Sequence, residues 1–178
     1  ADGATVDLAY TLDPRDPIFG SALRIDTKTA VPNVRIRYHT SLQASGLQWM
    51  TPAQTASGKQ PFMFSQSQAI HARSWVPLQD TPSVRFTYTA HVTAPKALRV
   101  VMSADNDIAH ALDGDYRFRM QQPIPSYLLA ISVGELDVRS TGPRTAVFAE
   151  PSVVAKAAKE FEDTEAMIAA AEKLYGAY

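Results

Sequence analysis

The strongest constraint on the fold is the strict alternation in the stretch PSVRFTYTAHVTAP, residues 82–95. Every second residue from Val84 to Val92 is apolar, and the residues between them are arginine, threonine and histidine. In an extended chain these two sets of side chains lie on opposite faces. One face then covers a hydrophobic core while the other meets solvent, so the stretch predicts an antiparallel strand.

Shorter segments with related patterns occur along most of the chain. We expect further strands in residues 5–12, 33–40, 98–103, 115–121, 126–134, 136–141 and 144–149. Turn residues separate these segments, and the Asp-Pro pairs at 13–14 and 16–17 end the first of them. This spacing is typical of a sandwich or an open antiparallel sheet.

Two of these strands carry specific expectations. In residues 33–40, Val34, Ile36 and Tyr38 share one face and alternate with charged side chains, so we expect a half-buried antiparallel strand. Residues 98–103 follow a Pro-Lys-Ala turn, and we expect them to pair with residues 82–95. The acidic stretch 103–118 is then a hairpin loop before the next strand, rather than a calcium loop, because glycine and glutamate are missing from the positions that such a loop requires.

The period changes after Pro151, where the chain becomes rich in alanine, glutamate and lysine. Ser152 is placed to cap the first amides of a helix, and Gly176 to end it. Asp163-Thr164 would divide the segment into two helices. An approximate apolar stripe comprises Val154, Ala157, Ala158, Phe161, Ile168, Ala171 and Leu174.

Composition excludes several classes of function. The 178 residues include 46% hydrophobic and 20% charged residues with a net charge of −1, which gives no basic face for nucleic acid. The absence of cysteine removes disulfides and thiolate ligands. No apolar run is long enough to span a membrane, and residues 1–10 have no signal-peptide pattern. We expect a cytoplasmic protein, or a periplasmic or secreted one if a signal peptide was removed.

The residues alone provide no catalytic constellation. None of the four histidines begins an H-E-x-x-H motif, residues 56–60 lack the pattern of a phosphate loop, and no G-x-S-x-G motif occurs. The notable feature is FSQSQAIHARSW, residues 64–75, in which Gln66 and Gln68 would lie on one face of a strand. These amides either belong to a solvated face or hold the backbone of an extended ligand.

Four motifs carry a resemblance to a known family: GLQW (46–49), FSQSQAIHAR (64–73), QDTPSV (79–84) and GPRT (142–145). In this order they resemble the N-terminal β-domain of the leukotriene A4 hydrolase family of zinc aminopeptidases, also called gluzincin aminopeptidases. The similarity runs from about Pro17 to Tyr178, and EFEDTEAMI (160–168) resembles the start of the family's catalytic domain.

The resemblance implies a mainly β fold, with an antiparallel or mixed saddle-like sheet and a C-terminal helical segment. It also implies a parent enzyme that removes N-terminal residues from peptide substrates with a catalytic zinc. Gln66 and Gln68 match the family's two substrate-binding glutamines, and Ala69 matches the residue at the wall of the first side-chain pocket. The family's zinc ligands and catalytic groups have no counterpart in this chain, so we expect no catalytic residue and no metal site here.

This pattern suggests a fragment. We expect residues 1–150 to be the N-terminal β-domain without its earliest strands, and residues 151–178 to be the truncated helical start of the catalytic domain. Unpaired sheet edges and an uncovered apolar stripe would then favour self-association. Two alternatives stay open: a stand-alone, non-catalytic β-domain that binds peptides or a protein partner, and a purely structural scaffold in which the glutamines are solvated.

Overall fold

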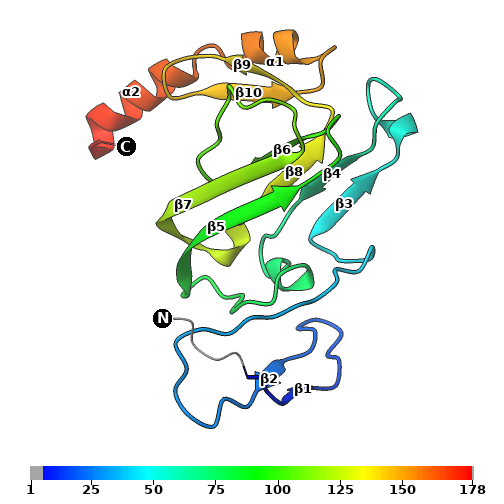
Figure 1. The fold of residues 1–178 in the computed structure, drawn as a ribbon. Coiled ribbons are helices and arrows are strands. Elements are labelled where there is room, and N and C mark those ends of the chain that lie inside the picture. The colour runs from blue at the N-terminus through cyan, green and yellow to red at the C-terminus, as the bar shows by residue number, and fades with distance from the viewer. Residues whose placement is uncertain (1–5, 178) are drawn as a thin grey trace.

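The computed structural model describes residues 6–177, and it is built mainly from short antiparallel strands with two helices at the C-terminal end (Figure 1). The predicted mainly β fold with a C-terminal helical segment is confirmed. Every strand pair among the described residues is antiparallel. The β1–β2 ribbon lies at the opposite end of the molecule from the helices (Figure 1).

Ten strands form four sheets within the described residues. The first two-stranded sheet joins β1 (Tyr10–Leu12) and β2 (Leu23–Ile25). A four-stranded sheet has the order β3 (Leu47–Met50), β4 (Phe62–Ser65), β8 (Ile131–Gly134), β6 (Arg99–Met102). The other two sheets pair β5 (Arg85–Thr93) with β7 (Asp115–Pro125), and β9 (Asp137–Ser140) with β10 (Ala146–Ala149).

The long alternating strand behaves as its pattern predicts. From Arg85 to Thr93 exposed and half-buried residues alternate without a break, and Phe86, Tyr88, Ala90 and Val92 pack against the core. Its partner, however, is β7, whereas β6 lies within residues 98–103 and pairs with β8. The expected pairing of 98–103 with 82–95 is therefore wrong. Three of the four residues of β6 are buried, which suits a strand in the second layer rather than a half-exposed partner of β5.

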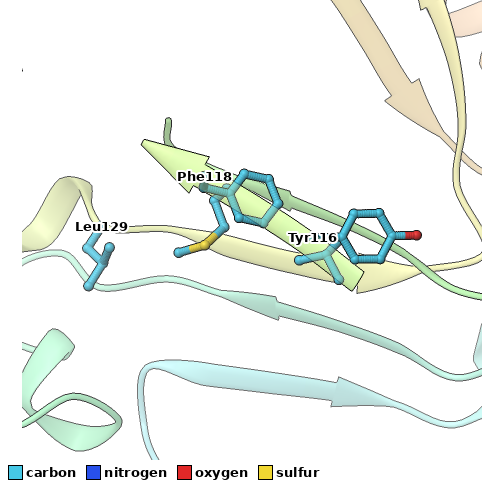
Figure 2. Close-up of a cluster of buried hydrophobic side chains, with 5 residues drawn as sticks. Tyr116, Phe118 and Leu129 are labelled. Atoms are coloured by element: carbon cyan, nitrogen blue, oxygen red, sulfur yellow. The ribbon is translucent and has the colours of Figure 1, made fainter. Parts of the chain in front are cut away.

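The core lies between the β5–β7 sheet and the four-stranded sheet. Its buried cluster contains Tyr116 and Phe118 of β7, Val100 and Met102 of β6, and Leu129, which precedes β8. Figure 2 shows the rings of Tyr116 and Phe118 projecting from the same strand, and their centroids are 6.5 Å apart in a stacked arrangement. The Tyr116 hydroxyl donates a hydrogen bond to the Leu98 carbonyl at 2.9 Å, so the buried phenol has a partner.

Residues 33–40 form no strand, which corrects the expectation for that segment. The side chains of Val34, Ile36 and Tyr38 are all exposed, and no strand pairs with this segment within the described residues. Alternation describes the two faces of an extended chain, but a strand also needs a neighbour for its backbone amides and carbonyls. Here the described part of the chain supplies none.

Other elements differ from expectation at their ends. Of residues 5–12, only Tyr10–Leu12 is a strand, and Thr5 lies outside the described residues. Residues 126–134 begin with a 3-10 turn at Ser126–Leu128 before β8. The acidic stretch after β6 is not a hairpin loop, because it connects strands in different sheets. Asn106 fixes the beginning of this stretch to the end of β6. Its Nδ2 donates to the Met102 carbonyl at 2.8 Å, and its Oδ1 accepts from the Met102 amide at 3.1 Å.

The C-terminal segment divides at Asp163-Thr164 as predicted, into α1 (Val154–Glu160) and α2 (Thr164–Tyr175). Gly176 follows α2 with φ of +99°, a conformation that favours glycine. The predicted cap at Ser152 is wrong, because Val153 occupies the N-cap position and no side chain caps the helix. The Glu150 carbonyl instead accepts from the amides of Val153 and Val154 at 2.8 and 2.9 Å.

Arg144 fastens α2 to the loop between β9 and β10. Its guanidinium bonds to Glu165 at 3.3 Å and to Glu172 at 2.8 Å, and its backbone amide donates to Glu165 at 2.8 Å. A Cβ built on Gly142 would lie 2.1 Å from Cγ of Glu165, so the helix packs closely against this loop. The contact joins the GPRT motif to the EFEDTEAMI motif.

The core cluster predicts a large effect of truncation. We expect Phe118→Ala to lower the free energy of unfolding by about 3–5 kcal/mol, because it removes a buried ring between the two sheets. Leu112→Ala, at an exposed position in the loop before β7, should stay within about 0.5 kcal/mol of the unmodified protein. Urea unfolding followed by tryptophan fluorescence measures both, and equal losses would contradict this description of the core.

Candidate functional site

The two glutamines lie in a turn directly after β4. The strand ends at Ser65, and the Gln66 amide still donates to the Gly46 carbonyl at 2.8 Å. Beyond this bond the chain leaves the sheet, so the prediction that Gln66 and Gln68 lie within a strand is wrong. Gln66 and Gln68 are both exposed, and Ser67 between them is only 2% exposed. This pattern is compatible with the prediction that the two amides lie on the same side of the chain.

Local hydrogen bonds define the shape of this segment, residues 66–69, which we call the glutamine turn. The backbone amide of Gln68 donates to Oε1 of Gln66 at 2.9 Å, and the His71 amide donates to the Ser67 carbonyl at 2.9 Å. The peptide bond between Gln68 and Ala69 is cis, and Ala69 is exposed. The turn thus presents Gln66, Gln68 and Ala69 to solvent from a backbone that is tied back to the fold.

The free hydrogen-bonding capacity of the two amides differs. Oε1 of Gln66 is occupied by the Gln68 backbone, while Nε2 of Gln66 makes no hydrogen bond to a described residue. The side-chain amide of Gln68 likewise has no partner among residues 6–177. A primary amide has two donors on nitrogen and acceptor sites on oxygen. Gln66 therefore offers mainly donors, and Gln68 offers both donors and an acceptor.

Gly46 allows the start of β3 to approach the segment that follows the turn. A Cβ at this position would lie 2.5 Å from the His71 carbonyl oxygen and 2.9 Å from the Ser74 hydroxyl. The Gly46 amide donates to that hydroxyl at 2.8 Å. Because its carbonyl also accepts from Gln66, this glycine holds both ends of the segment 66–74.

A buried carboxylate supports the same segment from the other side. Arg73 lies in the 3-10 turn η2 (Ala72–Ser74), and Asp80 accepts from its backbone amide at 3.0 Å and from its Nε at 3.1 Å. The Ser126 hydroxyl donates to the second oxygen of Asp80. The Asp80 side chain is 1% exposed, so these bonds satisfy a carboxylate that is removed from solvent. Arg73 also donates to the Phe19 carbonyl at 3.1 Å, which connects the N-terminal segment.

Asp80 is ionised in the folded protein at neutral pH. Burial by itself raises the pKa of its carboxyl group, but the hydrogen bonds from Ser126 and from the backbone and side chain of Arg73 outweigh that effect. The pKa of Asp80 consequently lies below its ordinary value. The paired charge therefore contributes to folding at neutral pH.

The described residues contain no group of three or more histidine or acidic side chains that could hold a metal ion. His71, His91 and His110 bond instead to Ser45, Asp115 and Asp113 respectively. These described residues therefore do not fit a catalytic zinc. Among residues 6–177, no helix has the length and apolar character of a membrane span.

Comparison with known proteins identifies the family of this chain. The family model described as the peptidase M1 N-terminal domain matches residues 19–128. The chain belongs to this family. It is 45% identical over 150 residues to leukotriene A-4 hydrolase of Xenopus laevis, covering 82% of this chain and 25% of that protein. It is also 41% identical over 179 residues to leucine aminopeptidase 2 of Yarrowia lipolytica, covering 95% of this chain and 26% of that protein.

Solved structures support the fold of this M1 domain. The native leukotriene A4 hydrolase of Saccharomyces cerevisiae superposes with a TM-score of 0.86 and 38% identity, over 97% of this chain and 28% of that one. The chain therefore spans about a quarter of the length of the relatives it matches. The predicted resemblance to the N-terminal domain of the leukotriene A4 hydrolase family is confirmed.

Several supporting residues were not singled out from the sequence. Gly46, Asp80 and Ser126 converge on segment 66–74 only through the fold. Gly46 and Asp80 lie inside the motifs GLQW and QDTPSV, and this position in the motifs could have marked them as supporting residues. Ser126 offered none, because a serine at the end of a strand has many roles.

The buried carboxylate gives the protein a specific acid sensitivity. Since the folded pKa of Asp80 is lowered, its contribution is fully present above the unfolded value of about 3.9 and is lost as the pH falls through the folded value. We expect Asp80→Asn to lower the free energy of unfolding at pH 7 by about 1–3 kcal/mol and to flatten its decline below about pH 4.

Asp105→Asn is the matched control, because Asp105 is exposed and its side chain makes no hydrogen bond to a described residue. It should leave both the stability at pH 7 and the acid limb nearly unchanged. Urea titrations at pH values from neutral to about 3 measure the comparison. An Asp80→Asn variant with an unaltered dependence of stability on pH would refute the assignment.

Proposed function

We propose that this M1 domain is the substrate-positioning N-terminal portion of a zinc-dependent aminopeptidase that removes N-terminal residues from peptides. The observation that carries the proposal is the glutamine turn, which presents two amides to solvent from an anchored backbone. The M1 family membership and the aminopeptidases among the relatives add support from outside the structure.

The amides suit the backbone or the α-amino group of a peptide. Nε2 of Gln66 would donate to a peptide carbonyl, because Oε1 of the same amide is engaged by the Gln68 backbone. Gln68 would donate to a carbonyl or accept from an amino group. Such contacts hold a peptide without selecting its side chain, and they orient the scissile bond without transferring a proton. Ala69 would form the wall of the first side-chain pocket.

The catalytic machinery is assigned to the remainder of a longer polypeptide. We place the boundary near residue 150, with residues 151–178 as the helical start of the catalytic domain. The zinc, its ligands and the general base would belong to that domain, where the metal supplies Lewis-acid activation of the peptide carbonyl and of water. A cytoplasmic location is part of the proposal, and a cysteine-free chain suits a reducing compartment.

Steady-state kinetics of the full-length protein test the role of the turn. With an aminoacyl chromogenic substrate, we expect Gln68→Leu to raise KM about tenfold with little change in kcat, the effect of one lost hydrogen bond. Gln121→Leu is the matched control, because Gln121 is exposed on β7 in another sheet. Unchanged kinetics for both Gln66→Leu and Gln68→Leu would reject substrate positioning by the turn.

The isolated 178-residue chain provides the second comparison. We expect no turnover of the same substrate with or without added zinc, whereas the full-length protein should lose activity on chelation and regain it with zinc. Turnover that copurifies with the isolated chain would overturn the assignment of catalysis to the remainder. A full-length protein without peptidase activity that still binds peptides would favour the stand-alone binding domain.

The isolated chain should also self-associate. Met167, Leu174 and Tyr175 of α2 expose their apolar side chains, and β5 and β7 each have one edge without a strand partner in the described residues. Sedimentation velocity should show dimers or larger species as concentration rises. The variant Met167→Lys/Leu174→Lys should reduce them, and Ala169→Lys on the other face of α2 should not. A monomer at all concentrations would contradict this expectation.

A further inference from the structure

Ser67 differs from its neighbours in the glutamine turn because its side chain points inward. Its hydroxyl donates to the Leu129 carbonyl at 3.3 Å and accepts from the indole Nε1 of Trp75 at 3.1 Å. Its own carbonyl accepts from the His71 amide at 2.9 Å. Both capacities of one buried hydroxyl are therefore used, and they connect the turn to two separate parts of the fold.

The two partners of the hydroxyl are themselves fixed by the interior. Leu129 belongs to the buried cluster between the two main sheets, and Trp75 packs against that cluster. The next strand holds the preceding residue as well, since the Ile131 amide donates to the Ser65 hydroxyl at 2.9 Å. The position of the glutamine turn thus depends on the same packing that holds the sheets together.

We infer that Ser67 and Trp75 are the positioning residues of the glutamine turn, and that their hydrogen bond sets how Gln66 and Gln68 are presented to a peptide. The effect of these residues on peptide binding rests on the proposed function, whereas their effect on the position of the turn does not. With the hydroxyl removed, the Leu129 carbonyl and the indole N–H lose a partner at a buried point. The turn would then keep the Gly46 bond at one end while its middle is released.

The structural part is tested in the 178-residue chain by amide hydrogen exchange measured with NMR. For Ser67→Ala and for Trp75→Phe, we expect exchange at the Gln68 and His71 amides to rise about tenfold, with the amides of β5 and β7 unchanged. Ser67→Cys keeps a weak donor and acceptor and should stay within about twofold of the unmodified protein. The double variant should exchange no faster than Ser67→Ala alone, because Ser67→Ala already removes the bond to the indole that Trp75→Phe removes.

The functional part is tested in the full-length enzyme. We expect Ser67→Ala to raise KM about fivefold to tenfold with kcat little changed, and Ser67→Cys to restore the value. Combined with Gln68→Leu, Ser67→Ala should add little further, since it acts through the glutamines. Unchanged exchange at Gln68 and His71 in Ser67→Ala would overturn the inference whatever the kinetics show.

The two proposals fail in distinguishable ways. If Gln66→Leu and Gln68→Leu leave KM unchanged, the proposed function fails, and hydrogen exchange alone decides whether Ser67 positions the turn. If the glutamine variants raise KM but Ser67→Ala and Trp75→Phe do not, the inference fails and the proposed function stands. A fully additive effect of Ser67→Ala and Gln68→Leu would also count against positioning through the glutamines.

Discussion

The packing of the β5–β7 sheet against the four-stranded sheet is the interaction on which the rest of the structure depends. Tyr116 and Phe118 fill the space between the layers together with Val100, Met102 and Leu129. Removal of large apolar side chains from water is the dominant favourable term in folding. Leu129 of this cluster belongs to the connection before β8, and Trp75, which follows the turn after β4, packs against the cluster, so the geometry of both segments depends on this core.

The motifs that revealed the family correspond to two sets of contacts. Gly46 in GLQW, Ser67 and Arg73 in FSQSQAIHAR, and Asp80 in QDTPSV all support segment 66–74. Arg144 in GPRT and Glu165 in EFEDTEAMI join the β9–β10 loop to α2. The recognisable residues are thus mostly ones that fix backbone positions through hydrogen bonds or close approach.

Local patterns predicted the elements better than their partners. The two faces of residues 82–95, the strands within 136–141 and 144–149 and the division of the helical segment at Asp163-Thr164 were predicted from the sequence, because each depends on short-range periodicity or turn chemistry. The pairing of 98–103 and the strand at 33–40 were wrong, since sequence periodicity does not say which neighbour supplies the hydrogen bonds. The two glutamines were noticed from the residues alone, but a substrate-binding role for them was predicted only through the resemblance, and their anchoring at Ser67 was found only through the fold.

The alternation of consecutive strands between the two layers has a consequence for how the chain folds. β5, β6, β7 and β8 lie in turn in one sheet and then the other, so between residues 85 and 134 the two paired strands of each sheet are separated in sequence by a strand of the other sheet (Figure 1). Contacts that join distant parts of a chain form slowly, because loop closure precedes the contacts that compensate for it. Folding of this region should therefore be concerted, and a ribosome-bound chain should gain a protected glutamine turn only after β8 has emerged.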